Sequence, residues 1–201
     1  MVISQFSTKP FVYLASRSPR RVELLNQIGV RCESLPADID ETKQIGESPE
    51  TYVTRLARQK AAACLTRLTS EQGLHPVIAA DTTVVLAENV LEKPVDDADA
   101  RNMLQQLSGS VHVVLTAVAM AWKGNIEVVV SNSLVEMMVL SERQIAHFIA
   151  SGEHLDKAGS YGIQGLAGAW IKRIDGSYSG VMGLPVYETA ALLRKAGVGV
   201  F

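Results

Sequence analysis

The sequence Phe-Val-Tyr-Leu-Ala-Ser-Arg-Ser-Pro-Arg-Arg, residues 11–21, joins a short apolar run to the start of a helix. The run, 11–15, is typical of a buried strand, and Pro19 is pre-set for the first turn of a helix. A helix start carries unpaired amides and the positive end of the helix dipole, and both favour phosphate. Arg20 and Arg21 add forked donors with permanent charge that match phosphate oxygens. The junction therefore predicts an anion site.

The same motif leaves a plainer interpretation open. Ser18 would cap an ordinary helix, and the two arginines would lie on its solvated face. Strings of this kind also occur in loops and in phosphorylation sites. The motif alone does not decide between the two interpretations.

The composition predicts a globular protein with a full core. The chain has 201 residues, 47% of them apolar, and no repeat or linker, so we expect a single domain, 1–201, or two closely joined lobes. A formal net charge of -2 argues against a general nucleic-acid binder and favours a small-molecule ligand. No apolar run approaches the ~20 residues of a membrane span, and the polar start, residues 1–10, lacks the core of a signal peptide. We therefore expect no membrane association and a cytoplasmic location.

The cysteines and histidines predict no metal site. Cys32 and Cys64 are isolated, which indicates two small core residues. The histidines match no metal-ligand spacing, and we expect them on the surface or hydrogen-bonded in the core. They are His75, His112, His147 and His154.

Strands and helices alternate in the first half of the chain, and hairpins follow. Apolar runs bounded by turn residues predict strands at 11–15, 30–35, 76–86, 111–122, 126–140, 169–174 and 177–182. Helical spacing and capping residues predict helices at 20–28, 49–66, 96–107 and 141–151, and a last helix after Pro185. This order indicates an α/β fold built on a mixed sheet.

One of the predicted strands contains a charge. Asp81 interrupts the apolar run 76–86, where an ionised carboxylate is costly unless a cation, a metal or hydrogen-bond donors accompany it. Ligands of open α/β sheets usually bind at strand ends. We therefore interpret Asp81 as a functional carboxylate; the alternative is a carboxylate that fixes a neighbouring loop through backbone hydrogen bonds.

Lys60 is a second charge in an apolar setting. In the helix 49–66 it falls near the centre of the arc of apolar side chains. It is either an anion ligand or a lysine that extends from the edge of the core into water. Lys93 closes the loop after the strand 76–86, where it either binds the same anion or pairs with Glu92 on the surface.

Together these charges describe a nucleoside triphosphate site. Basic side chains would neutralise a polyphosphate, and two carboxylates would hold Mg²⁺, which usually takes few carboxylates together with phosphate oxygens. The basic residues are Arg20, Arg21, Lys60 and Lys93, and the acidic residues are Glu41, from an acidic loop, and Asp81. Glu41 alone is equally consistent with a solvated charge. The chain has no Walker motif, and the glycine-rich segment 159–168 does not fit a dinucleotide-binding loop.

Five separated motifs give the chain a family resemblance. They are LASRSPRR (14–21), ADT (80–82), KP (93–94), SYGIQG (160–165) and GLP (183–185), in that order. With them the chain resembles the Maf family of nucleoside triphosphate pyrophosphatases over essentially its whole length. One departure is Ser160, where the family more often has Gly or Ala.

The resemblance implies a fold and an activity. The expected fold is an elongated mixed β-sheet flanked by helices, with two lobes and a central cleft, related to the inosine triphosphate pyrophosphatases. Family members hydrolyse a nucleoside triphosphate between the α and β phosphates and need a divalent cation, Mg²⁺ or Mn²⁺. The alternative is a nucleotide-binding regulator of cell division with little turnover. A homodimer is consistent with the family, and the apolar stretch 128–130 would serve as its edge.

The resemblance also implies roles for particular residues. Asp81 matches the proton acceptor or metal-linked carboxylate, and Glu41 matches the other acidic residue of the site. The residues that match the phosphate-facing set are Ser16, Arg21, Lys60 and Lys93.

Three positions separate subgroups of the family: Arg20, Thr82 and Gln164. This trio resembles the subgroup that acts on dTTP and UTP. Other bases, including modified pyrimidines that such an enzyme would keep out of nucleic acids, are the alternative substrates. A glutamine amide both donates and accepts, as the O4 and N3–H edge of uracil or thymine requires, although Gln164 is equally suited to hold its own loop.

Overall fold

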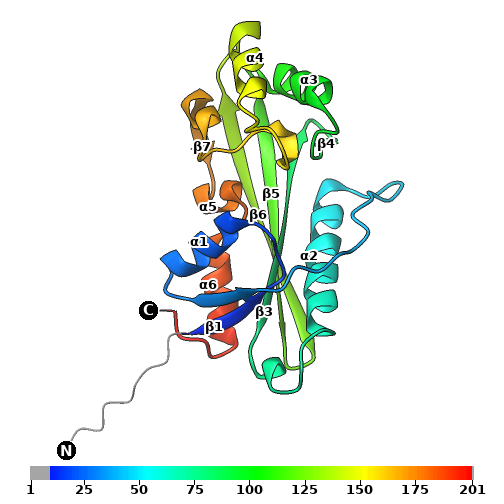
Figure 1. The fold of residues 1–201 in the computed structure, drawn as a ribbon, viewed down its shortest axis with the longest axis vertical. Helices are drawn as coiled ribbons and strands as arrows, with labels where there is room; N and C mark the ends of the chain where they lie inside the picture. The colour runs from blue at the N-terminus through cyan, green and yellow to red at the C-terminus, as the bar shows by residue number, and fades with distance from the viewer. Residues whose placement is uncertain (1–9, 201) are drawn as a thin grey trace, which may run out of the picture.

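A seven-stranded mixed sheet runs through the molecule in the computed structural model, which describes residues 10–200 (Figure 1). The strands are β1 (Phe11–Leu14), β2 (Arg31–Ser34), β3 (Val77–Leu86), β4 (Asn89–Leu91), β5 (Val111–Trp122), β6 (Asn125–Met137) and β7 (Ile171–Asp175). Their order is β2-β1-β3-β5-β6-β7, and β4 pairs with β3 beside this path. β1 is parallel to β2 and β3, and the other pairs in the described chain are antiparallel. Residues 1–9, most of the polar start considered above, and residue 201 lie outside the described residues.

Helices cover both faces of the sheet (Figure 1). They are α1 (Pro19–Gln27), α2 (Pro49–Leu65), α3 (Asp97–Leu107), α4 (Glu142–Ala150), α5 (Tyr178–Met182) and α6 (Val186–Lys195), with 3₁₀ turns at Gln72–Leu74, Ala158–Ser160 and Leu166–Trp170. α2 packs Val53 and Ala57 against one face of the sheet. The other helices lie against or beside the opposite face. Within residues 10–200, no helix is long and apolar enough to cross a membrane.

The face opposite α2 carries two separate apolar cores. One core packs α1 and α6 against Ile78 and Val118. The other packs α3 and α4 against Val84 and Val114. Between them a row of hydroxyl side chains crosses the sheet in register, formed by Thr82, Thr116 and Ser131. The two cores are the two lobes, so the predicted two-lobed mixed sheet is confirmed.

Where the two lobes meet, one edge of β3 has no paired strand, and we call this stretch the bare edge. β1 pairs with β3 only as far as Ile78, and β4 pairs with it only from Val84, which leaves 79–83 without a strand partner on that edge. A cleft of about 860 Å³ opens along this stretch. Successive side chains of a strand point to opposite faces, so Asp81 meets α2 while Thr82 meets α1. The bare edge therefore gives one cleft access to both faces of the sheet.

The prediction of a strand at 177–182 is wrong, because this segment forms α5. Ser177 caps the helix, with its Oγ accepting a hydrogen bond from the Gly180 amide at 3.0 Å. Gly183 ends the helix with a φ of +114°, a conformation that favours glycine. A segment this short contains too few apolar residues for their spacing to separate a strand from a helix.

Most helix starts agree with the prediction. Ser48 Oγ accepts from the Thr51 amide at 3.2 Å at the start of α2, and Ser141 and Gln144 form the expected reciprocal capping box. β4 was not predicted, since a three-residue strand carries almost no periodic signal. Of the two cysteines, Cys64 lies in the core and Cys32 is half-buried.

Candidate active site

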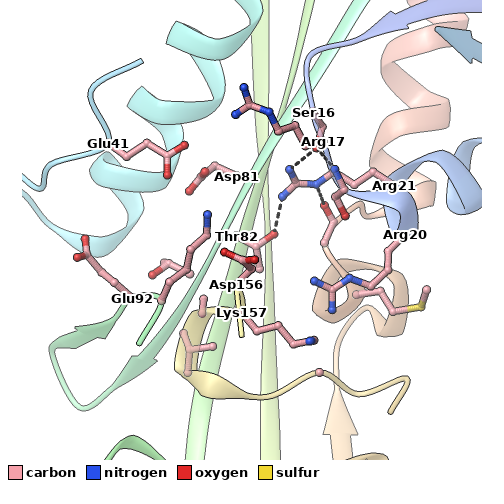
Figure 2. Close-up of a pocket in the computed structure, with 18 of the residues that line it drawn as sticks. Ser16, Arg17, Arg20, Arg21, Glu41, Asp81, Thr82, Glu92, Asp156 and Lys157 are labelled. Carbon is pink, nitrogen blue, oxygen red and sulfur yellow. Dashed lines mark hydrogen bonds between the residues drawn. The ribbon is translucent and has the colours of Figure 1, made fainter. Parts of the chain in front are cut away.

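The cleft between the lobes brings together most of the predicted site residues (Figure 2). The predicted residues that line it are Ser16, Arg20, Arg21, Glu41, Lys60, Asp81, Thr82 and Lys93. Gln164 is exposed and lies outside the lining, whereas its neighbours Gly162 and Ile163 belong to it. The phosphate-facing and acidic sets therefore share one cavity, and one member of the specificity trio lies apart from it.

The start of α1 opens into the cleft. Pro19 is the first residue of the helix, and Ser18 holds the cap position without a side-chain hydrogen bond to the helix. The Oγ of Ser16 accepts instead from the Ser18 amide at 3.1 Å and from Arg21 Nη1 at 3.0 Å. Because Arg21 is turned inward, the plainer interpretation, a helix capped by the Ser18 side chain with solvated arginines, does not describe α1.

Arg21 joins α1 to β3 and to the end of α5. Its Nε donates to the Gly183 carbonyl at 2.7 Å, and its Nη2 donates to Thr82 Oγ1 at 3.3 Å. Burial lowers the pKa of Arg21, and the charges of Asp81 and Glu41 oppose that shift. The groups that accept these hydrogen bonds are neutral, so the guanidinium charge remains available to an anion in the cleft.

On the other face of β3, Lys60 bridges the two predicted acidic residues. Its Nζ lies 2.5 Å from Asp81 Oδ1 and 2.7 Å from Glu41 Oε1. Burial raises the pKa of Asp81 above its ordinary value, although the charge of Lys60 opposes this. Burial also raises the pKa of Glu41, but the hydrogen bond and charge of Lys60 outweigh it, and that pKa lies below its ordinary value. Of the two carboxylates, Asp81 is in the environment that favours uptake of a proton.

The same two carboxylates fit a shared divalent cation. One oxygen of each reaches the same ammonium, so Glu41 and Asp81 already converge on a single positive charge. Among residues 10–200, no group of three or more His, Cys, Asp or Glu side chains is placed to hold a metal ion. Mg²⁺ is usually held by one or two carboxylates, with phosphate oxygens and water as its other ligands. The pair is therefore suited to a metal ion that arrives with a phosphate-bearing ligand.

Comparison with known protein families matches residues 11–196 to the family described as Maf-like protein. The chain belongs to the Maf family. A relative from Methylobacillus flagellatus is 53% identical over 189 residues, 94% of each chain. Relatives from Shewanella oneidensis (50% identical, 92% of this chain and 97% of the relative) and Nitrosomonas europaea (49% identical, 94% and 96%) are similar. All three are named dTTP/UTP pyrophosphatase. Among solved structures, the Ham1 protein of Staphylococcus aureus matches 63% of this chain and 71% of its own, with 14% identity and a TM-score of 0.47.

Tyr52 is a residue of this Maf cleft that the sequence analysis missed. Its hydroxyl donates to Glu92 Oε1 at 2.8 Å and lies 3.1 Å from the Glu41 carbonyl oxygen. Burial and the hydrogen bond to Glu92 raise the pKa of Tyr52. Glu92, which the sequence analysis considered as a surface partner of Lys93, accepts this hydrogen bond from Tyr52. The sequence feature that could have revealed Tyr52 is its place in the apolar arc of the helix, because the hydroxyl of a buried tyrosine needs a hydrogen-bond partner.

Lys157 was also missed, and it lies opposite α1 in the Maf cleft (Figure 2). A Cβ on Gly162 would lie 3.0 Å from Arg20 Nη1 and equally close to the Lys157 side chain, so glycine leaves the room in which these two cations approach. Burial lowers the pKa of Lys157, and Arg20 lowers it further. No sequence signal could have found this residue, because its meeting with Arg20 depends on how the loop after α4 crosses the cleft.

His112 was expected on the surface or hydrogen-bonded in the core, and it lies buried behind the cleft wall. Its Nε2 is 2.6 Å from the hydroxyl of Tyr161, a lining residue, while its Nδ1 has no partner within residues 10–200. Burial lowers the pKa of His112 to about 4. The imidazole is therefore neutral at pH 7, and only one of its nitrogens is satisfied.

Proposed function

We propose that this protein is a nucleoside triphosphate pyrophosphatase that hydrolyses dTTP and UTP to the monophosphate and diphosphate. The observation that carries the proposal is a single cleft in which a buried carboxylate, Asp81, lies near several cationic side chains. Membership of the Maf family and the names of the relatives support the same activity. The structure gives no observation that favours a regulator of cell division without turnover.

In this proposal the cationic residues bind the phosphates. Arg20, Arg21 and Lys93 contact phosphate oxygens beside the open start of α1 and the Ser16 hydroxyl. Their charge also stabilises the pyrophosphate leaving group, on which negative charge grows as the bond breaks. Lys60 reaches the same phosphates from its position between the two carboxylates.

Asp81 is the proton acceptor for the water that attacks the α-phosphorus. Its Oδ1 is bonded to Lys60, which leaves Oδ2 for the water. Burial raises the pKa of Asp81 and so moves this carboxylate toward the range in which a general base works near neutral pH. When bound at Glu41 and Asp81, Mg²⁺ or Mn²⁺ supplies Lewis-acid chemistry that neutralises phosphate charge and acidifies water.

Base selection is assigned to Arg20, Thr82 and Gln164. Arg20 and Thr82 line the cleft, while Gln164 reaches the base only if the segment 160–165 moves inward. Apolar side chains next to Thr82 suit the flat face of a pyrimidine; they are Val84, Val114, Val181 and Met182. Modified pyrimidine nucleotides present the same face, so we include them among the substrates that the enzyme would keep out of nucleic acids.

The assembly is part of the proposal. Residues 128–130 pair with β5 on one side, and β7 pairs with β6 only from Leu134, so this stretch has no strand partner on its other edge within the described chain. An unpaired apolar edge supports the homodimer predicted above. The single domain spanning 1–201 and the cytoplasmic location stay predictions from the sequence.

Release of pyrophosphate from a panel of ordinary and modified nucleoside triphosphates, with Mg²⁺ or Mn²⁺, tests the proposal. We expect dTTP and UTP to be the best substrates and Asp81→Asn to abolish most of the release. Tight nucleotide binding without release of pyrophosphate would contradict an enzymatic role and favour a binding protein.

A further inference from the structure

The loop 35–48 joins β2 to α2 and carries Glu41, although it contains no helix or strand of its own. In the described chain, the side chains of α2 that reach residues 41–47 through hydrogen bonds or ion pairs are those of Tyr52, Arg55 and Lys60. The place of Glu41 in the cleft therefore depends on contacts between the loop and this helix.

Two of these side chains give no independent hold on Glu41 once a metal ion is bound. Lys60 contacts the Glu41 carboxylate itself, at 2.7 Å, and a metal ion held by the two carboxylates of the site competes with this contact. Tyr52 lies 3.1 Å from the Glu41 carbonyl oxygen, but its single proton goes to Glu92 at the shorter distance of 2.8 Å. Arg55 is the contact that is independent of both.

The guanidinium of Arg55 holds the loop at two points. Its Nε and Nη2 donate to the two carboxylate oxygens of Glu47 at 2.7 and 2.8 Å, and Nη2 also donates to the Thr42 carbonyl at 3.0 Å. Glu47 in turn accepts from the Gln44 amide at 3.0 Å. The Glu47 side chain is only 4% exposed, and the hydrogen bonds from Arg55 lower its pKa to about 2. The pair is therefore charged at neutral pH, with a bidentate geometry that ordinary surface ion pairs lack.

Arg55 and Glu47 take no direct part in the chemistry of the cleft. Neither residue lines it, and Glu47 already balances the charge of Arg55. What their contact fixes is the backbone next to Glu41, because the Thr42 carbonyl lies one residue further along the chain. A carboxylate on a loop binds a metal ion well only when its backbone is held, since the cost of ordering a free loop opposes binding.

We propose that Arg55 and Glu47 are positioning residues for the two carboxylates of the site: their bidentate contact holds the loop on α2, so that the Glu41 carboxylate stays within reach of a shared cation. The inference rests on the proposed function, because it concerns the metal ion that the pyrophosphatase would use. Loss of the contact weakens metal binding and leaves the basicity of Asp81 unchanged.

The test measures binding of Mn²⁺ to the nucleotide-free protein by electron paramagnetic resonance, in the wild type and in Arg55→Met. We expect Arg55→Met to bind Mn²⁺ about tenfold more weakly, because ordering of the loop then opposes binding. In assays of pyrophosphate release, the Mn²⁺ concentration that gives half-maximal activity should rise by a similar factor, while kcat at saturating Mn²⁺ changes little. Arg58→Met, at an exposed arginine of the same helix outside the cleft lining, is the matched control and should bind Mn²⁺ as the wild type does.

Ser141→Ala separates positioning from a general loss of stability. Ser141 caps α4, so its replacement lowers the melting temperature without removing a contact of the loop. We expect this variant to keep the Mn²⁺ affinity of the wild type. Equal losses of affinity in Ser141→Ala and Arg55→Met would assign the effect to stability and overturn the inference.

Glu47→Gln and its combination with Arg55→Met form a double-mutant cycle. Glutamine keeps the size of the side chain but turns an amino group toward Arg55, so the affinity for Mn²⁺ should fall about threefold. The double variant should bind no more weakly than Arg55→Met alone, because both replacements remove the same contact, and additive losses would contradict the inference. If Arg55→Met does not fold, Glu47→Gln is compared with the same controls.

The proposed function and the inference can fail separately. A wild type that releases no pyrophosphate contradicts the proposed function, while weaker Mn²⁺ binding by Arg55→Met would still support the inference. Unchanged Mn²⁺ affinity in Arg55→Met, or a wild type that does not bind Mn²⁺, overturns the inference even if pyrophosphate is released.

Discussion

The two sides of β3 at the cleft differ in the way they hold charge, although Asp81 and Thr82 are neighbours in the chain (Figure 2). On the Asp81 side, charged groups neutralise one another, because Lys60 is shared between two carboxylates. On the Thr82 side, the cation Arg21 is held only by neutral oxygens. In the proposed mechanism one side serves proton transfer and the other serves anion binding. A step of one residue along a bare strand edge is enough to separate these two tasks within a single cavity.

The largest expected effect concerns the acidic side alone. Asp81→Asn keeps the size of the side chain but removes its basicity, so turnover should fall by a factor on the order of 10³ while nucleotide affinity changes little. Pyrophosphate release and calorimetric binding measure the two quantities. Asp175→Asn, at an exposed acid outside the cleft lining, is the control. Near-normal turnover of Asp81→Asn would remove Asp81 from the chemistry.

On the Thr82 side of the sheet, the buried residue His112 should make the stability of the protein depend on pH. His112 lies on the same face of β5 as Thr116, and burial lowers its pKa to about 4 from an unfolded value near 6.5. Between these values the unfolded chain binds a proton that the folded chain does not. The contribution of neutral, buried His112 to the free energy of unfolding is therefore complete above about pH 6.5. It falls as the pH falls, and at pH 4 it is lower by about 3 kcal/mol.

Urea unfolding of the wild type and His112→Gln between pH 7 and pH 4 measures this contribution. The variant should lose less stability over that range, whereas His147→Gln, at an exposed histidine, should follow the wild type. Parallel pH profiles for the wild type and His112→Gln would mean that folding does not lower the pKa of His112.

Arg21→Lys tests whether the Thr82 side needs the forked hydrogen-bond donors of a guanidinium or only a positive charge. Lysine keeps the charge but cannot reach Gly183, Ser16 and Thr82 at once. We expect kcat/KM to fall roughly 50-fold, mainly through KM, with a lower melting temperature. Arg194→Lys, at the exposed end of α6, controls for the substitution itself. Activity equal to the wild type would show that charge alone is sufficient.

The smallest expected effect is in metal binding on the acidic side. Lys60→Met leaves Glu41 and Asp81 without their shared cation, so Mn²⁺ should bind the nucleotide-free protein about tenfold more tightly than it binds the wild type. Electron paramagnetic resonance of free Mn²⁺ measures the affinity, and Lys123→Met, in the exposed turn after β5, is the control. Unchanged Mn²⁺ affinity would mean that the ammonium does not compete with the ion.

Local signals in the sequence predicted the elements that local physics determines. The Pro19 junction, the capping box at Ser141 and the charge of Asp81 inside an apolar strand each depend on residues close together in the chain. These signals and the family resemblance were sufficient for the mixed sheet and for a set of site residues of which all but Gln164 line the cleft. The strand predicted at 177–182 failed because a short segment follows its cap rather than its weak periodicity.

Contacts between distant residues were not predictable from the sequence. Lys60 was seen as an unusual charge, but its bridge between Asp81 and Glu41 requires α2 to pack over β3 in one register. Thr116 looks like an ordinary β-branched strand residue until β5 places it opposite Thr82. Such contacts depend on pairing across the sheet, which no short stretch of sequence encodes.

The bare edge of β3 also affects the solubility of this protein. An unpaired strand edge inside an apolar sheet is a template on which other chains can add a strand and aggregate. Here the unpaired stretch, 79–83, lies within a cleft between two lobes and carries a carboxylate at its centre, paired with a lysine from α2. An incoming strand would have to bury that ion pair against its own backbone, which is unfavourable. The carboxylate proposed to accept a proton from water therefore also protects the sheet from intermolecular strand addition.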